Sequence, residues 1–345
     1  MMEIEKKENF EPKYLEYLTD LTKDAYSHSY FDNAFTVFKT INNLLYLIYV
    51  NIYNSIVCYD LNNNQKINEI KSNQTYIKNF RHQTDINNKR DLLISISNNN
   101  IKLWNVNNCE CILDLQDIYN DDNINSACFL NDNSQIYIVV CGSNFPKEPE
   151  PIKVFDFHGR NIKEINNSND SKIFIDTYYS NEYLENYIIV GCKGFAKSYN
   201  YNKNMLYHIY SNFNEHSVIS IVIINDDNIE KLIESSQDRN IRIWNFHTGL
   251  LLNKIEVKSQ ILYGICLWDN EFLFVGCFDN TIKLINLKNG EIIKELSGHK
   301  NSIITIKKVN IPKYGECLIS KGNKNDQYKL WVYFSKFNCK KNNTI

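Results

Sequence analysis

The sequence contains no long apolar segment. Its longest apolar stretches, such as residues 44–50, have the length of a strand, and none approaches the roughly 18 apolar residues of a membrane-spanning helix. The first residues, MMEIEKKENFEPK, are charged from residue 3 and lack the apolar core of a secretory signal. We therefore expect neither membrane insertion nor secretion. A cytoplasmic location is expected, with the nucleus as the alternative.

Arginine is scarce, and neither sign of charge dominates. The chain carries 38 Lys and Arg residues against 40 Asp and Glu residues, which gives a net charge of −2. Of the few arginines, Arg239 alone falls in a turn where clustered arginines could bind a phosphorylated peptide. A chain without a global basic field is not expected to bind nucleic acids in general.

Metal-binding patterns are missing as well. The ten cysteines include no CxxC pair, and Cys109 and Cys111 are separated by a single residue, which is poor spacing for a zinc site. Cys141, Cys192 and Cys277 recur in similar contexts, VVCGS, VGCKG and VGCFD. They are interpreted as small buried residues of equivalent strands, reduced in a cytosol-like compartment. We expect no bound metal.

Patterns that carry catalysis are also lacking. The nearest approach to a phosphate-binding loop, GCKG at 191–194, does not have the GxxxxGK[ST] spacing and is interpreted as a turn. The paired acids at 121–122 and 226–227 lie in expected loops and are interpreted as solvated. We therefore expect no catalytic residues, no cofactor and no enzymatic activity.

What the sequence does contain is a repeat. Seven similar segments, among them IKLWNV at 101–106, IRIWNF at 241–246 and YKLWVY at 328–333, carry a bulky residue in the same slot. Six of the seven slots are followed by Asp or Asn, and the slots are separated by 45, 51, 44, 45, 41 and 46 residues. The slot residues are Tyr59, Trp104, Phe155, Tyr199, Trp244, Ile285 and Trp331. A regular spacing of this length indicates an array of equivalent structural units.

Each unit has the pattern of about four β-strands. A short run rich in Ile, Val, Leu and aromatic residues precedes each slot, and another strand follows a turn within about five positions after it. Those turns contain Asn or Gly, which tolerate the positive φ of tight hairpins. The turn residues are Asn63, Asn108, Gly159, Asn204, Gly249 and Gly290. One four-stranded unit cannot bury both of its faces alone, whereas seven arranged in a ring bury each face on a neighbour.

This pattern resembles the WD40 repeat over almost the whole chain. The resemblance implies an all-β fold, a seven-bladed WD40-type β-propeller with four antiparallel strands per blade. We expect the propeller to occupy residues 25–337 and a short polar tail to occupy 338–345. The N-terminal segment 1–24 is expected to contain a strand, with YLEYLT at 14–19 as the candidate, that completes the last blade beside Trp331.

The resemblance also implies a hydrogen-bonded tetrad of His, Ser or Thr, Asp and Trp within a blade. Carried over, the fifth unit supplies His216, Ser236 (or Ser235), Asp238 and Trp244, and the seventh supplies His299, Ser320 and Trp331. A catalytic triad of His216, Ser236 and Asp238 is the alternative. It is disfavoured because a triad needs an exposed serine and an oxyanion hole.

The sequence departs from the family where the repeats should end in Trp-Asp. Asn or Val follows each Trp in the slot, and the sole literal Trp-Asp, Trp268–Asp269, is out of phase. We interpret Trp268 as part of a turn between strands. Replacing Trp268 with Ala is therefore expected to destabilise the fold less than replacing Trp244.

The resemblance further implies binding of proteins or peptides. We expect the partner-binding face to carry the turns before each third strand, including a proline-rich loop at 143–151. Its candidate residues are Asn99, Phe145, Lys147, Arg239, Phe278 and Asn280. The rim or the opposite face of the ring is the alternative.

These observations predict a non-catalytic scaffold. The first alternative is a substrate-recognition or assembly subunit of a larger complex, such as a ubiquitin ligase or a ciliary, trafficking or RNA-processing complex. A propeller hydrolase is a further alternative. Nothing in the sequence identifies the partner or the oligomeric state.

Overall fold

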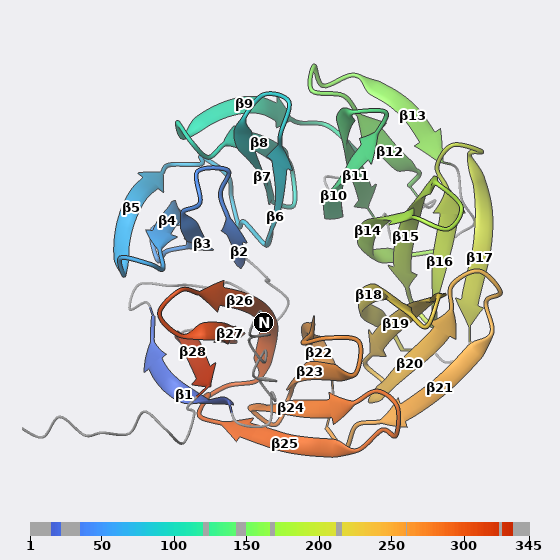
Figure 1. Ribbon diagram of the computed structural model, residues 1–345. Helices are drawn as coiled ribbons and strands as arrows, with labels where there is room; N and C mark the ends of the chain where they lie inside the picture. The colour runs from blue at the N-terminus through green and yellow to red at the C-terminus, as the bar shows by residue number, and fades with distance from the viewer. Residues whose placement is uncertain are drawn as a thin grey trace, which may run out of the picture.

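The computed structural model describes residues 15–21, 35–119, 124–142, 150–165, 170–211, 216–259, 261–323 and 326–333. These residues form seven four-stranded antiparallel sheets, arranged as blades around a central axis (Figure 1). The first strand of each blade lies innermost, and the fourth lies at the rim. The predicted all-β class and the seven four-stranded blades are confirmed.

The strands of the first four blades follow the chain without interruption. Blade 1 contains β2 (Phe35–Lys39), β3 (Leu45–Val50), β4 (Ile56–Asp60) and β5 (Gln65–Ile70), and blade 2 contains β6 (Asn79–Asp85), β7 (Arg90–Ile96), β8 (Ile101–Asn105) and β9 (Glu110–Leu115). Blade 3 contains β10 (Ile124–Asp132), β11 (Gln135–Gly142), β12 (Ile152–Phe155) and β13 (Asn161–Ile165), and blade 4 contains β14 (Lys172–Ser180), β15 (Glu185–Cys192), β16 (Phe195–Asn200) and β17 (Met205–Ser211).

The remaining blades include the strand that closes the ring. Blade 5 contains β18 (Val218–Asp226), β19 (Ile229–Ser236), β20 (Asn240–Asn245) and β21 (Leu251–Glu256), and blade 6 contains β22 (Ile261–Leu267), β23 (Phe272–Cys277), β24 (Thr281–Asn286) and β25 (Ile292–Ser297). Blade 7 contains β26 (Ile303–Ile311), β27 (Gly315–Gly322), β28 (Tyr328–Tyr333) and, from the start of the chain, β1 (Leu15–Asp20).

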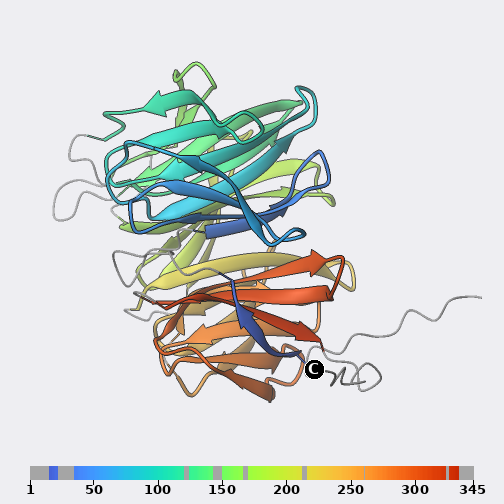
Figure 2. The ribbon, with the colours of Figure 1, turned by 90° about the vertical axis from the view of Figure 1, so that its left-hand side faces the viewer.

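The ring closes through β1, which pairs antiparallel with β28. Tyr17 stands opposite Trp331 in this pairing, as the sequence predicted for a strand in this segment. Lys329 Nζ reaches Asp20 Oδ1 at 2.7 Å, and Leu15 is fully buried between blades 6 and 7. Figure 2 shows β1 in blue beside the red strands of blade 7. An otherwise unpaired edge of β28 is thereby covered.

The hydrophobic core lies between blades rather than within them. The buried side chains form seven clusters, and each cluster joins two neighbouring blades. The second strand β3 is therefore buried along its whole length, and the other second strands are buried over most of theirs, whereas rim strands such as β5 are mostly exposed. The bulky slot residue of every blade packs into the cluster shared with the preceding blade. This shared packing explains why the slot recurs once per blade.

The predicted Asn and Gly turns need a correction in two blades. Gly159, Asn204, Gly249 and Gly290 adopt the positive φ that was expected after the slot. In blades 1 and 2, however, the residues with positive φ are Asn64 and Cys109 rather than Asn63 and Asn108. The left-handed residue therefore follows the slot by five positions in blades 1 and 2, as in blades 4, 5 and 6, and in blade 2 a cysteine adopts this conformation.

Trp268 lies in the turn between β22 and β23, but it is not an exposed turn residue. Its side chain is 4% exposed and packs edge-on against Phe274, with ring centroids 5.6 Å apart. The ammonium group of Lys308 lies 4.5 Å from the centroid of the Trp268 ring. The expectation that Trp268 contributes less to stability than Trp244 therefore loses its physical basis, since both are buried.

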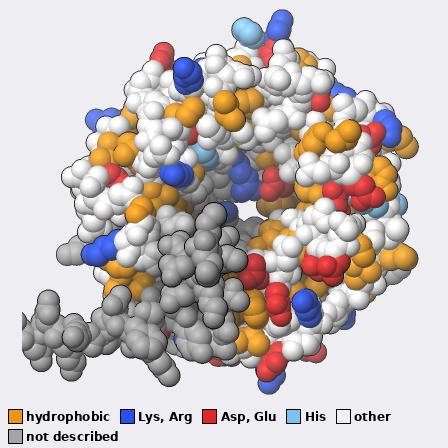
Figure 3. Space-filling model, viewed as in Figure 1, with side chains coloured by type: hydrophobic (Ala, Val, Ile, Leu, Met, Phe, Trp, Pro, Cys, Tyr) orange, Lys and Arg blue, Asp and Glu red, His pale blue; other side chains and the backbone are white. Residues whose placement is uncertain are grey.

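Two further features bear on function. No helix among the described residues is long and apolar enough to cross a bilayer. The ring is open at its centre on the face shown in Figure 3. The predicted tail at 338–345 lies outside the described residues.

Candidate functional site

The two faces of the ring carry different sets of turns. Because the first strands of all blades run in the same direction along the axis, the turns that join second and third strands gather on one face, here called the second-turn face. The turns that join first and second strands gather on the opposite face, the first-turn face. Residues distant in sequence are thereby brought onto one surface.

The structure places four of the predicted partner-binding residues in turns of the second-turn face. Asn99, Arg239 and Phe278 are exposed, Phe278 by 53%, and Asn280 is half-buried. Arg239 and Asn280 adopt left-handed backbone conformations, with φ of 69° and 68°. Phe145 and Lys147 lie outside the described residues. The face thus presents side chains from blades 2, 5 and 6.

Blade 1 adds apolar residues that the sequence reasoning missed. Ile52 and Tyr53 occupy the turn between β3 and β4, and Tyr53 is 78% exposed. Asn51 Oδ1 accepts hydrogen bonds from the backbone N–H groups of Tyr53 and Ser55, both at 3.0 Å, which hold the turn in place. The signal was present in the sequence, since an Ile-Tyr pair between two Asn residues is unusual in a polar turn.

A second exposed tyrosine lies close to this turn. Tyr76, 54% exposed, belongs to the connection from β5 to β6, which reaches the same face. The side-chain amide of Asn54 donates a hydrogen bond to the backbone carbonyl of Gln74, which ties that connection to the β3–β4 turn. Blade 1 therefore presents two tyrosines and an isoleucine on ordered backbone. We call Ile52, Tyr53, Tyr76 and Phe278 the apolar set of this face.

A tetrad occupies the core of blade 7. His299 Nδ1 lies 2.9 Å from Asp326 Oδ2, and His299 Nε2 lies 2.6 Å from Ser320 Oγ. The indole N–H of Trp331 donates to Ser320 Oγ at 2.7 Å. The sequence reasoning named His299, Ser320 and Trp331 but missed Asp326, because the loop before Trp331 is longer than in other units. Asp326 also accepts hydrogen bonds from the backbone N–H groups of Lys300 and Asn301.

Electrostatics define the protonation states of this tetrad. Burial lowers the pKa of His299, against the opposing effect of Asp326, so the imidazole is neutral at pH 7. Its Nδ1–H then donates to Asp326, and its Nε2 accepts from the Ser320 hydroxyl. Although burial opposes ionisation, hydrogen bonds from His299 and from the backbone N–H groups of Lys300 and Asn301 lower the pKa of Asp326 to about 2. Each polar side-chain atom of the four tetrad residues therefore has a hydrogen-bond partner.

The same connectivity could be mistaken for a catalytic triad, because Asp326, His299 and Ser320 are linked in that order. Ser320 is fully buried, however, and its oxygen already accepts the Trp331 indole N–H. A substrate cannot reach a hydroxyl in this position. The arrangement stabilises the blade rather than forming an accessible nucleophile.

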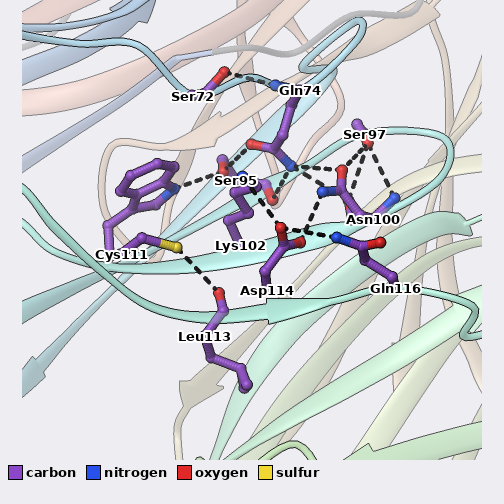
Figure 4. A network of polar contacts seen from close by, with 11 residues as sticks. Ser72, Gln74, Ser95, Ser97, Asn100, Lys102, Cys111, Leu113, Asp114 and Gln116 are labelled. Atoms are coloured by element: carbon purple, nitrogen blue, oxygen red, sulfur yellow. Dashed lines mark hydrogen bonds and ion pairs between the residues drawn. The ribbon is translucent and has the colours of Figure 1, made fainter.

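Blade 2 builds an equivalent network from amides (Figure 4). The indole N–H of Trp104 donates to Ser95 Oγ at 2.8 Å, and the Ser95 hydroxyl donates to Gln74 Oε1. Gln74 Nε2 in turn donates to Asn100 Oδ1 at 3.2 Å. Gln74 precedes Ser95 by 21 residues, the same separation as His299 and Ser320 in blade 7. That spacing is the signal that could have revealed the network in the sequence.

Blade 5 departs from the predicted tetrad and requires a correction. Leu232 pairs with Trp244, so the position two residues further along β19 is Glu234, not Ser236. Ser95 and Ser320 occupy this position in blades 2 and 7. The Trp244 indole N–H makes no hydrogen bond to Ser236, whose hydroxyl instead accepts the backbone N–H of Asp238 at 3.4 Å. Ser236 therefore matches the tetrad serine in residue type only, because it lies two residues beyond the structurally equivalent position.

A buried ion cluster replaces the tetrad in blade 5. Arg242 lies between Glu234, 3.4 Å from its nearest carboxylate oxygen, and Asp238, with which it forms an ion pair. Arg242 is 1% exposed. Burial raises the pKa of Glu234 to about 7, although the positive charge of Arg242 acts in the opposite direction. His216 is exposed at the start of this blade. His216, Ser236 and Asp238 therefore do not offer an accessible serine nucleophile, since Ser236 is fully buried.

Metal and thiol chemistry find no further support in the described part of the chain. No group of three or more His, Cys, Asp or Glu side chains there could hold a metal ion. The nine cysteines in the described ranges are free thiols, and six of them are buried. Burial raises the pKa of the Cys141, Cys192 and Cys277 thiols to about 12, which keeps them protonated and unreactive.

Comparisons with known proteins give short matches to WD-repeat proteins. No protein-family model matches the chain. The chain is 30% identical over 78 residues to the U3 small nucleolar RNA-associated protein 21 homolog of Schizosaccharomyces pombe, covering 22% of this chain and 9% of that protein. It is 25% identical over 117 residues to the nuclear distribution protein PAC1 of Saccharomyces cerevisiae, covering 34% and 24% of the two chains.

A third relative carries the repeat in its name. The chain is 27% identical over 109 residues to the WD repeat domain-containing protein 83 homolog of Dictyostelium discoideum, covering 31% of this chain and 32% of that protein. The matched part spans at most 32% of the length of these three relatives. The similarity therefore covers about a third or less of each relative.

Proposed function

Because this chain is a seven-bladed β-propeller of the WD40 type, we propose that it is a non-catalytic scaffold that binds proteins or peptides. The observation that carries the proposal is the apolar set on the second-turn face. Its members Ile52, Tyr53, Tyr76 and Phe278 are each more than half exposed. Aromatic side chains held on ordered backbone are the usual anchors of protein interfaces, because they bury large areas at low entropic cost.

The overall charge of the chain supports a protein partner rather than a nucleic acid, because its net charge of −2 provides no general basic field. The described candidates on the second-turn face, Asn99, Arg239, Phe278 and Asn280, include a single arginine. Phosphate binding in general requires several clustered cations. A peptide partner instead needs apolar contacts and hydrogen bonds, which Tyr53 and Asn99 can supply.

The proposal includes a role as an assembly or substrate-recognition subunit of a larger complex. The relatives are named for different processes, and the chain resembles only a small part of each. An assembly or substrate-recognition subunit uses a propeller in the same physical way, as a rigid binding surface. The buried free thiols are consistent with a cytoplasmic location, where cysteines remain reduced.

An affinity capture experiment tests this proposal. The protein is tagged and its partners are recovered from cells and identified by mass spectrometry. Tyr53→Ser, Tyr76→Ser and Phe278→Ser are combined in one variant, which removes three exposed rings from the second-turn face. We expect this variant to lose most of the recovered partners while it keeps the unfolding temperature of the unchanged protein.

A matched control changes exposed apolar residues of the opposite face. Ile86 and Leu184 lie in turns between first and second strands and are 76% and 72% exposed. Replacing both with Ser should leave partner recovery intact. If the triple variant recovers its partners normally, or if only the control variant loses them, the binding site does not lie on the second-turn face.

A further inference from the structure

Charged side chains from three separate blades meet in the central channel. Arg81 on β6, Asp176 on β14 and Lys307 on β26 belong to the innermost strands of blades 2, 4 and 7. Burial lowers the pKa of Lys307, the nearby charge of Arg81 lowers it further, and Asp176 raises it. The three groups therefore lie within electrostatic reach of one another. Figure 3 shows basic and acidic side chains at the wall of the opening.

The Arg81 guanidinium has two donors without an acceptor. Its Nε and Nη2 atoms are buried and make no hydrogen bond to any described residue. The guanidinium carbon lies 5.5 Å from the centroid of the Phe174 ring, which offers stacking but no acceptor atom. Nε and Nη2 are the adjacent donors that bind a carboxylate or phosphate in bidentate fashion. No hydrogen bond from Nε or Nη2 holds the Arg81 guanidinium against the Phe174 ring, so the guanidinium can turn toward the channel.

A polar cavity adjoins Arg81. Its volume is about 450 Å³, and its lining includes Arg81, Gln83, Asn131, Asp176, Thr177 and Tyr179. One water occupies about 30 Å³ of liquid, so the cavity has room for an anion with part of its hydration shell. Gln83, Asn131 and Tyr179 can donate neutral hydrogen bonds, as sites that bind oxyanions do.

We propose that this cavity is a binding site for a small oxyanion, a phosphate- or carboxylate-bearing molecule. Arg81 supplies two adjacent N–H donors, and Lys307, which does not line the cavity, adds a positive charge near Arg81. Asp176 offsets one of these charges and so weakens the site for highly charged anions. The site is separate from the apolar set on the second-turn face and does not depend on the function proposed above.

Calorimetric titration tests the site with pyrophosphate and citrate as probes. The two probes distinguish phosphate from carboxylate as the preferred group, and constant ionic strength keeps screening equal between experiments. We expect Arg81→Gln to weaken binding of the preferred probe about tenfold or more, since a charged bidentate contact is lost. Lys307→Gln should weaken it less, because Lys307 supplies charge without the two adjacent donors.

The opposite substitution makes the test specific. Asp176→Asn removes the negative charge of the cluster and is expected to strengthen binding of the same probe. Arg160→Gln is the matched control, because it removes one arginine charge from a side chain that is 73% exposed outside the channel. Thermal unfolding verifies that each variant is folded.

Three results would overturn the proposed site. The first is the absence of measurable binding of either probe to the unchanged protein. The second is equal binding by the unchanged protein and a folded Arg81→Gln variant. The third is an equal loss of binding with Arg160→Gln, which would indicate non-specific attraction to positive charge.

Discussion

Glu234 is a carboxyl group held in the core of blade 5, where burial raises its pKa to about 7. In the unfolded chain a glutamate titrates near 4.3. Between these two values the folded protein retains a proton that the unfolded chain has released. The free energy of unfolding must therefore fall as the pH rises from about 4.3 to about 7.

Replacing Glu234 with Gln should remove this pH dependence. The difference between a pKa of about 4.3 and one of about 7 corresponds to about 3–4 kcal/mol of unfolding free energy. We expect urea denaturation to show that Glu234→Gln is less stable relative to the unchanged protein at pH 5 than at pH 8. Glu256→Gln, an exposed change in the same blade, serves as control. Parallel pH profiles for the unchanged protein and Glu234→Gln would contradict the assignment.

Trp331 and Trp244 occupy equivalent slots but differ in one hydrogen bond. The Trp331 indole N–H donates to Ser320, whereas the Trp244 indole lies beside Glu234, whose pKa it lowers, and makes no hydrogen bond of normal length to a described residue. Both rings are buried, so replacement by Phe removes similar apolar area in the two blades. The difference between the variants therefore isolates the hydrogen bond.

We expect Trp331→Phe to destabilise the protein by about 1–3 kcal/mol more than Trp244→Phe. The excess arises because Ser320 keeps a buried oxygen that has lost its donor. Chemical denaturation of the two variants measures it. Equal losses of stability would show that the tetrad of blade 7 contributes no more than packing.

At the scale of elements, the strand that closes the ring is held mainly by apolar contact. Leu15 of β1 is fully buried with Trp331 and Phe274, whereas the ion pair of Asp20 with Lys329 is open to solvent on the Asp20 side, which is 37% exposed. Ion pairs open to solvent contribute about 0–1 kcal/mol, because solvent screens them and the two side chains lose conformational freedom when they pair. A fully buried leucine contributes much more.

Leu15→Ala should therefore lower the free energy of unfolding by about 2–5 kcal/mol. Asp20→Asn should lower it by less than about 1 kcal/mol. Hydrogen exchange adds a local readout, since loss of β1 would expose backbone amides of β28. If the two variants are equally stable, β1 does not close the ring by apolar packing.

Elements also show how the same structural role is filled by different chemistry. Blade 7 uses His299 and Asp326, blade 2 uses Gln74 and Asn100, and blade 5 uses the charged Arg242 cluster. In blades 7 and 2, hydrogen bonds join the polar groups next to the buried tryptophan. In blade 5, charged side chains lie there instead. A residue-type motif is therefore a weaker guide to the tetrad than the strand register that aligns its members.

At the scale of the whole molecule, the ring separates stability from binding. The seven clusters between blades bury the slot residues, so the turns are free to vary without loss of the core. Ring closure also creates the channel, where Arg81, Asp176 and Lys307 meet although they are separated by more than 90 residues in the chain. Neither the second-turn face nor the channel exists in a single blade.

The sequence by itself determined the number of blades, their four-stranded pattern and the ring-closing strand. These features were predictable because a slot residue recurs at nearly constant spacing, and because strand and turn preferences act over a few neighbouring residues. Local periodicity also placed Asn99, Arg239, Phe278 and Asn280 in turns before third strands.

Only the tertiary structure decided which polar residues act together. Glu234 rather than Ser236 aligns with Trp244 because pairing between strands sets the register, and Asp326 joins His299 across a loop of variable length. Burial of Trp268 arises from packing against blade 7, which no local pattern encodes. The apolar set and the channel charges depend on the positions of whole blades, since residues far apart in sequence come onto one surface only when the ring closes.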